Sequence, residues 1–224
     1  MKKILLIFTI LLISFRQLGH NISNQIPNKK QVRGIDISAH QKHINWSKVK
    51  DIDFVFVKAT EGISIIDKKF NHNWSKVKEK KILRGAYHFY RPYVTPEKQF
   101  HNFKTMVRLE SGDLPPVLDV EVSLKNSKKF INDLKKWLTL AEKHYQIRPI
   151  IYCNSVYYRK YFSDKYFDKY PFWIANYVTE DINKIHSSWH FWQFTPRGRV
   201  SGINTHVDIN IFNGDYNSLL SLCK

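Results

Sequence analysis

The sequence predicts an α/β fold in which parallel strands, joined by crossover helices, form a barrel. Eight short β-rich runs recur from residue 32 onward, and helix-compatible stretches lie between several of them. The last runs follow one another with little helix between them, so a regular eightfold barrel would be incomplete there. At 224 residues the chain suits a single domain, which we place at residues 32–224.

The start of the chain resembles a secretory signal. Lys2 and Lys3 precede an apolar run at residues 4–15, which is shorter than the roughly 20 residues that a spanning helix needs. We therefore predict a signal peptide at residues 1–20, a linker at residues 21–31, and a secreted or periplasmic protein with no stable membrane span. An uncleaved N-terminal anchor is the alternative.

The charge balance is strongly basic, with 36 Lys and Arg against 19 Asp and Glu, a net charge of +17 spread along the chain. Such a charge attracts anionic partners. No nucleic-acid-binding motif is present, so we expect no nucleic-acid partner and predict an anionic cell-envelope surface instead, with solubility alone as the other interpretation. The two cysteines and ten histidines show no metal-ligand spacing. We expect no metal, no cofactor and a monomer.

The eight β-rich runs give the predicted strands. In chain order they are residues 32–38, 53–60, 83–90, 115–122, 148–154, 171–177, 190–195 and 206–212. Helix-compatible stretches occupy residues 67–81, 96–109, 127–145 and 155–162. In the third of these, Phe130, Leu134, Trp137, Leu138 and Ala141 recur at helical spacing, which predicts one inward-packed face.

Acidic residues interrupt these apolar strands. Asp119 and Glu121 are two residues apart in the PPVLDVEV run, so they share one face about 7 Å apart, while Leu118 and Val120 face the other way. Further acids lie within or at the ends of other runs: Asp36, Glu61 and Asp208. Because strand ends converge on one mouth of a parallel barrel, we expect four or five carboxylates in one cleft.

Such a cluster favours acid–base chemistry, although a single buried acid is more often structural. Burial and mutual repulsion raise the pKa of at least one member of a crowded pair, which leaves one acid protonated and another ionised. Glycoside hydrolysis needs that division of roles. The candidate substrate-binding residues are Tyr87, Tyr152, Trp173, Asn176, Gln193 and Glu61. Core packing for the aromatics, and turn capping for Asn176 and Gln193, are the structural alternatives.

A family resemblance covers most of residues 32–220. The segments that carry it, in order, are GIDISAHQ with INW, FVFVKATEG, GAYHFYRP, PPVLDVE, PIIYCN, FWIANY, WQFT and VDIN. With these segments the chain resembles the Chalaropsis-type lysozymes of glycoside hydrolase family 25. The resemblance implies an irregular, flattened TIM-like (β/α) barrel with eight strands and about five helices. It also implies N-acetylmuramidase activity on the β-1,4 bond between N-acetylmuramic acid and N-acetylglucosamine in the glycan strands of peptidoglycan.

The resemblance also implies roles for the four acids. Glu121 corresponds to the general acid/base, Asp119 to its partner in the D-x-E motif, and Asp36 and Asp208 to two further acids of the cleft. The implied mechanism is retaining, through either a carboxylate nucleophile or the 2-acetamido oxygen of the substrate. Two other classes stay open: a non-catalytic glycan-binding protein on the same barrel, and a phosphodiesterase whose acids hold a divalent ion.

Overall fold

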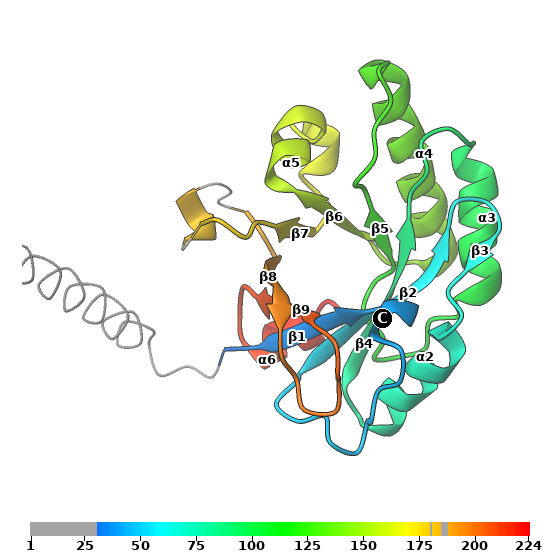
Figure 1. The fold of residues 1–224 in the computed structure, drawn as a ribbon. Coiled ribbons are helices and arrows are strands. Elements are labelled where there is room, and N and C mark those ends of the chain that lie inside the picture. Colours follow the sequence, from blue (N-terminus) through cyan, green and yellow to red (C-terminus); the bar gives the residue numbers. More distant parts are fainter. Residues whose placement is uncertain (1–30, 180, 185–187) are drawn as a thin grey trace, which may run out of the picture. The chain divides into compact units, whose positions relative to one another are not determined.

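Seven parallel strands and one antiparallel strand close into a barrel in the described part of the chain (Figure 1). The barrel strands are β1 (Arg33–Ile37), β2 (Phe54–Glu61), β4 (Leu83–Phe89), β5 (Val117–Asp119), β6 (Ile150–Asn154), β7 (Phe172–Ala175), β8 (Phe191–Gly198) and β9 (Val207–Phe212). Pairing of β1 with β2 closes the barrel, and β9 runs antiparallel to its neighbours β1 and β8. The predicted eight-stranded α/β barrel is thus confirmed, together with its irregular last third.

The computed structural model describes residues 31–179, 181–184 and 188–224, which belong to the compact unit Gln31–Lys224. The predicted signal peptide and residues 21–30 of the predicted linker lie outside the described residues. In the described part, no helix is both long and apolar enough to cross a membrane. Cys153 is buried, Cys223 is partly exposed, and both are free thiols.

Five α-helices belong to the described residues: α2 (Phe70–Glu79), α3 (Pro96–Met106), α4 (Ser127–Tyr145), α5 (Ser155–Tyr161) and α6 (Tyr216–Leu220). The bounds of α4 match the prediction. Asn126 caps its start by accepting from the Lys129 N–H, and Gln146 ends it in the left-handed conformation at φ 58°. Two short elements are not among the predicted ones: α6, and the two-residue β3 (Ile65–Ile66), which pairs with the end of β2.

Alternation along each strand separates two apolar regions. Outward-facing residues such as Leu118, Val120 and Ile174 pack into one cluster with the helices, whereas Phe54, Phe56 and Trp173 belong to a second, aromatic cluster inside the barrel. The Phe56 and Trp173 rings stack with centroids 4.5 Å apart. The aromatic cluster fills the barrel interior, so a cavity can open only towards its ends.

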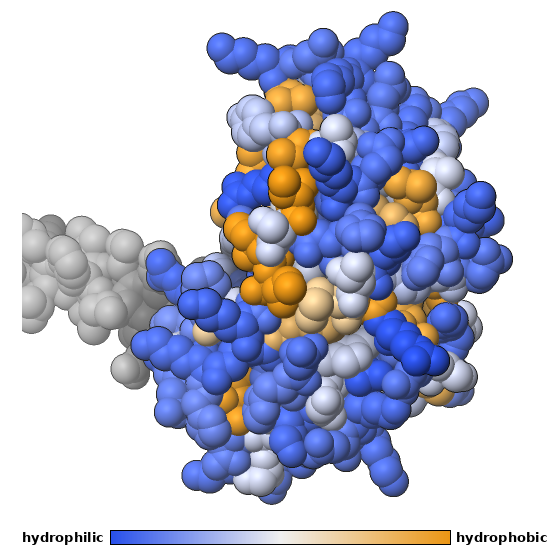
Figure 2. All heavy atoms as spheres, turned by 90° about the vertical axis from the view of Figure 1, so that its right-hand side faces the viewer, coloured by the Kyte–Doolittle hydropathy of each residue, from blue (hydrophilic) through white to orange (hydrophobic). Residues whose placement is uncertain are grey.

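The surface is largely hydrophilic on the face that Figure 2 shows, and apolar residues form smaller patches there. Exposed isoleucines lie on and beside β3: Ile63, Ile65 and Ile66.

The closed barrel predicts a steric test at Gly34, which lies opposite Phe54 in the β1–β2 pair. A Cβ atom at Gly34 would lie 2.3 Å from Cε2 of the Phe54 ring. We expect Gly34→Ala to lower the free energy of unfolding by about 1–3 kcal/mol, because the packed ring cannot yield freely. Urea unfolding measures this change. The double variant Gly34→Ala/Phe54→Leu should lose less free energy of unfolding than the two single variants lose in sum, because the smaller side chain leaves room for the added methyl group. A loss equal to that sum would contradict the steric account.

Candidate active site

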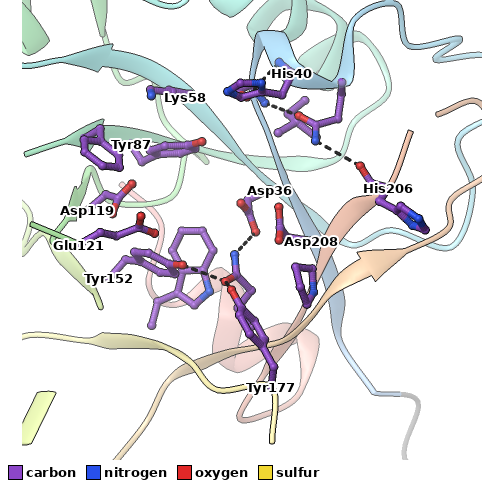
Figure 3. A pocket seen from close by; sticks show the side chains of 17 residues that line it. Asp36, His40, Lys58, Tyr87, Asp119, Glu121, Tyr152, Tyr177, His206 and Asp208 are labelled. Atoms are coloured by element: carbon purple, nitrogen blue, oxygen red, sulfur yellow. Dashed lines mark hydrogen bonds between the residues drawn. The ribbon is translucent and has the colours of Figure 1, made fainter. Parts of the chain in front are cut away.

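A cavity of about 390 Å³ opens at the mouth formed by the carboxyl ends of the parallel strands (Figure 3). Four acids line it: Asp36 on β1, Asp119 at the end of β5, Glu121 two residues beyond it, and Asp208 on β9. Asp36 and Asp208 are direct partners across the antiparallel β1–β9 pair. The structure therefore brings together the four acids that the sequence predicts as catalytic.

Asp119 and Glu121 share the cavity side, as alternation predicts, but they differ in exposure. Asp119 is 5% exposed, whereas Glu121 is exposed to solvent. Strand β5 ends at Asp119, earlier than predicted, because the last ladder bond on this side runs from the Val120 N–H to the Tyr152 carbonyl. Glu121 thus lies just beyond the sheet, where its carboxyl group can reach a molecule bound in the cavity.

Asp36 is held by a chain of hydrogen bonds that reaches across the neighbouring strands. Its Oδ2 atom accepts from Gln193 Nε2 and from Asn210 Nδ2, each at 2.8 Å. Asn210 Oδ1 in turn accepts from Trp173 Nε1 at 2.7 Å. Gln193 Oε1 accepts from the hydroxyl groups of Tyr152 and Tyr177. These bonds fix the Asp36 carboxyl group at the cavity wall.

Burial and crowding change the acidity of the cluster. Burial, reinforced by the neighbouring Asp208, raises the pKa of Asp36 to about 8, although its two amide partners lower it. Burial, together with the charge of Glu121, raises the pKa of Asp208 to about 6. Burial and then Glu121 raise the pKa of Asp119 well above its ordinary value. At neutral pH the cluster therefore combines protonated with ionised carboxyl groups.

Asp119 has an unusual environment. Its Oδ1 atom is buried and has no hydrogen-bond partner among the described residues. A buried polar atom without a partner is costly, and such atoms are often satisfied by a ligand. The cation of Lys58, which also lines the cavity, opposes the rise in the pKa of Asp119.

The predicted substrate-binding residues divide into two groups. Tyr87, Tyr152, Trp173 and Gln193 line the cavity. Glu61 and Asn176 are not part of its lining, contrary to expectation.

Local hydrogen bonds explain both exceptions. A register shift in β2 between Lys58 and Thr60 places Glu61 beside Phe89, where its carboxylate accepts from Lys58 Nζ at 2.7 Å and from Arg91 Nε at 2.9 Å. Asn176 caps a turn: its Oδ1 atom accepts two backbone N–H groups, and its Nδ2 atom donates to Ser155. The turn-capping alternative therefore describes Asn176.

Several residues of the cavity were not predicted from the sequence. The cavity lining also includes Lys58, His40, His206 and Tyr177, and Asn210 supports it from below. Alternation in the VDIN segment gives a signal for Asn210, which lies two residues after Asp208 and so shares its face. His40 comes from the short 3-10 helix Ala39–Gln41 and His206 from the loop before β9, where no strand periodicity applies.

Comparison with known proteins agrees with this geometry. Residues 35–203 match the family model described as "Glycosyl hydrolases family 25". The chain is 39% identical over 203 residues to the uncharacterized protein YegX of Escherichia coli, covering 87% of this chain and 74% of that protein. It is 32% identical over 210 residues to lysozyme M1 of Streptomyces globisporus, covering 86% and 71%.

Solved structures give the same result. A family 25 glycosyl hydrolase from Bacillus anthracis superposes with a TM-score of 0.80 at 28% identity, covering 90% of this chain and 97% of that one. A bacterial lysozyme from Streptomyces coelicolor gives 0.79 at 30% identity, covering 86% and 97%. With its barrel and its cluster of acids, the protein is a glycoside hydrolase. The chain belongs to glycosyl hydrolases family 25.

The raised pKa of Asp119 predicts a pH-dependent cost in stability. The folded state holds the proton more tightly than the unfolded state, so stability is greatest below the ordinary value of 3.8 and falls as the pH rises from there towards the raised value. We expect Asp119→Asn, which is neutral at every pH, to raise the free energy of unfolding by about 1–2 kcal/mol at pH 7, with a much smaller gain at pH 3.

Urea unfolding at both pH values measures this difference. Asp168→Asn supplies a control: because Asp168 is exposed, we expect the free energy of unfolding to change by less than about 0.5 kcal/mol. A gain at Asp119 that is equal at both pH values would contradict a cost due to ionisation.

Proposed function

We propose that this protein is a lysozyme, an N-acetylmuramidase that hydrolyses the β-1,4 bond between N-acetylmuramic acid and N-acetylglucosamine in peptidoglycan. The observation that carries the proposal is the pair of unlike acids in one cavity, an exposed Glu121 beside a buried Asp119 whose Oδ1 atom has no hydrogen-bond partner among the described residues. The names of related proteins support the substrate: a lysozyme M1, an autolytic lysozyme of Clostridium acetobutylicum and an N,O-diacetylmuramidase of Arthroderma benhamiae.

Glu121 acts as the general acid and then as the general base. In the first step its carboxyl proton passes to the glycosidic oxygen while the bond from that oxygen to the anomeric carbon breaks. The carboxylate that remains then removes a proton from water, whose oxygen attacks the anomeric carbon. Its exposed position beyond β5 suits both steps, because the leaving sugar and the incoming water must each reach it in turn.

Asp119 orients the 2-acetamido group of the sugar. Its unpartnered carboxyl oxygen can accept the acetamido N–H, which aims the acetamido oxygen at the anomeric carbon from the face opposite the leaving group. Attack by that oxygen and then by water gives two inversions and so retention overall. Burial favours this route over direct attack by Asp119, because it raises the pKa of Asp119 and so disfavours the negative charge that a nucleophile would need.

The walls of the cavity suit a sugar. The lining includes Tyr87, the exposed Tyr177 and the largely buried Tyr152 and Trp173, whose rings lie 4.4 Å apart. Aromatic faces pack against the apolar faces of sugar rings, while hydroxyl and amide groups bind the sugar's polar edges. The net charge of +17 adds attraction to an anionic cell envelope, and the signal-like residues 1–20 support a location outside the cytoplasm.

Replacement of Glu121 tests the proposal. We expect Glu121→Gln to lower the release of reducing ends from purified peptidoglycan by about 10²–10⁴-fold, because Gln keeps the shape but cannot transfer the proton. Glu79→Gln is the matched control, since Glu79 is an exposed glutamate on α2. Mass spectrometry of the wild-type digest should find N-acetylmuramic acid at the new reducing ends.

Three results would contradict the proposal in different ways. N-acetylglucosamine at the reducing ends would indicate a glucosaminidase. Binding of glycan fragments without cleavage would indicate a glycan-binding protein. Loss of activity in the presence of a chelator would indicate a metal-dependent reaction such as that of a phosphodiesterase.

A further inference from the structure

The orientations of two amide groups determine where Asp36 can carry a proton. The indole N–H of Trp173 is a donor and never an acceptor, so it must meet the Oδ1 atom of Asn210. The Nδ2 group of Asn210 then necessarily points to Asp36. On the other side, two tyrosine hydroxyl groups donate to Gln193 Oε1, which turns the Nε2 group of Gln193 towards the same Asp36 oxygen.

Two N–H donors therefore meet at Asp36 Oδ2, each at 2.8 Å. A carboxyl oxygen that already accepts two N–H hydrogen bonds has used both of its lone pairs. It therefore has no lone pair left to bind a proton. Any proton on this carboxyl group must sit on the other oxygen, Oδ1. No hydrogen bond joins Oδ1 to another described residue, and Asp36 lines the cavity. An O–H group at Oδ1 would therefore point into the cavity.

The surroundings of Asp36 favour the protonated form. Asp36 is 8% exposed, and Asp208 is its direct partner on the neighbouring strand. Figure 3 shows the carboxyl groups of Asp36 and Asp208 side by side at the cavity wall. The titratable groups that face the cavity from the other elements are Lys58, Tyr87, Asp119, Glu121, Tyr152, Tyr177, His40 and His206.

The basic side chains among these groups do little to stabilise a negative charge on Asp36. The Lys58 ammonium is paired with Glu61, and His40 and His206 are exposed at the rim. Asp208 and Glu121 are both anions when ionised, and each disfavours a second charge on Asp36. A pKa of about 8 for Asp36 agrees with this arrangement.

We propose that Asp36 works as a neutral acid whose Oδ1–H group donates a hydrogen bond to an oxygen of the bound sugar, while Asp208 is its ionised neighbour. This inference rests on the proposed function, because it assigns a role within the same cavity. It makes Asp36 a substrate-binding donor rather than a nucleophile or base. The five residues that hold it serve to orient that donor: Gln193, Asn210, Trp173, Tyr152 and Tyr177.

The amide variant Asp36→Asn imitates the proposed state. Its Oδ1 atom can accept from Gln193 and Asn210, and its Nδ2 group can then donate into the cavity where the acid would donate. Asp36→Leu keeps a similar volume but leaves both amide groups without an acceptor. At pH 6 we expect D36N to lower kcat/KM by at most about tenfold and D36L to lower it by at least about a hundredfold.

The pH profile separates a donor role from a structural one. Wild-type activity should fall as the pH rises through about 8, when Asp36 loses its proton, and D36N should lack that part of the decline. Titration of ¹³C-labelled aspartate carboxyl groups by NMR gives a readout that does not depend on activity. The Asp36 signal, identified by its loss in D36N, should remain that of a protonated acid at pH 7.

Two results would overturn the role of Asp36: a signal that titrates near the ordinary value of 3.8, or a D36N protein as inactive as D36L alongside an active wild-type protein. Failure of the proposed function looks different. In that case the wild-type protein itself would release no reducing ends from peptidoglycan, whatever the protonation state of Asp36.

Discussion

The antiparallel pairing of β9 with β1 is the constraint on which the site depends. Because β9 runs against the other strands, its first residues lie at the mouth where the parallel strands end, and Asp208 comes directly opposite Asp36. The same pairing places Asn210 beside Gly34, deeper in the barrel, where its amide group supports Asp36 from below. The pairing thus brings residues more than 170 positions apart into one hydrogen-bonded unit.

The carboxyl groups that the reaction needs lower the stability of the folded protein. Burying several carboxyl groups in one cavity is unfavourable, and the protein limits the cost through protonation and, at Asp36, through two amide donors. Beneath the acids, the stacked rings of Phe56 and Trp173 fill the barrel and exclude water from its interior. Trp173 has two roles, since its ring packs in this cluster while its indole N–H orients Asn210. Packing and acid–base chemistry are therefore coupled through one side chain.

Alternation along the strands made much of this arrangement predictable. All eight barrel strands and the four helix-compatible stretches correspond to elements of the structure, and Asp36, Asp119, Glu121 and Asp208 do meet in one cavity. Glu61 does not line the cavity because ion pairs with Lys58 and Arg91 hold its carboxylate, and no spacing rule reveals such pairs. Asn176 was misplaced because its side chain caps a local turn. Elements as short as β3 and α6 carry too few residues to show any periodicity.

The central claim is that one sugar ring sits among these acids with its scissile bond at Glu121 and its acetamido group at Asp119. The most direct measurement is a crystal structure of the Glu121→Gln protein with a bound peptidoglycan fragment. The account predicts the glycosidic oxygen within hydrogen-bond distance of the substituted amide side chain at position 121, and the 2-acetamido N–H on the Asp119 carboxyl group. A fragment bound with its acetamido group away from Asp119, or outside this cavity, would contradict it.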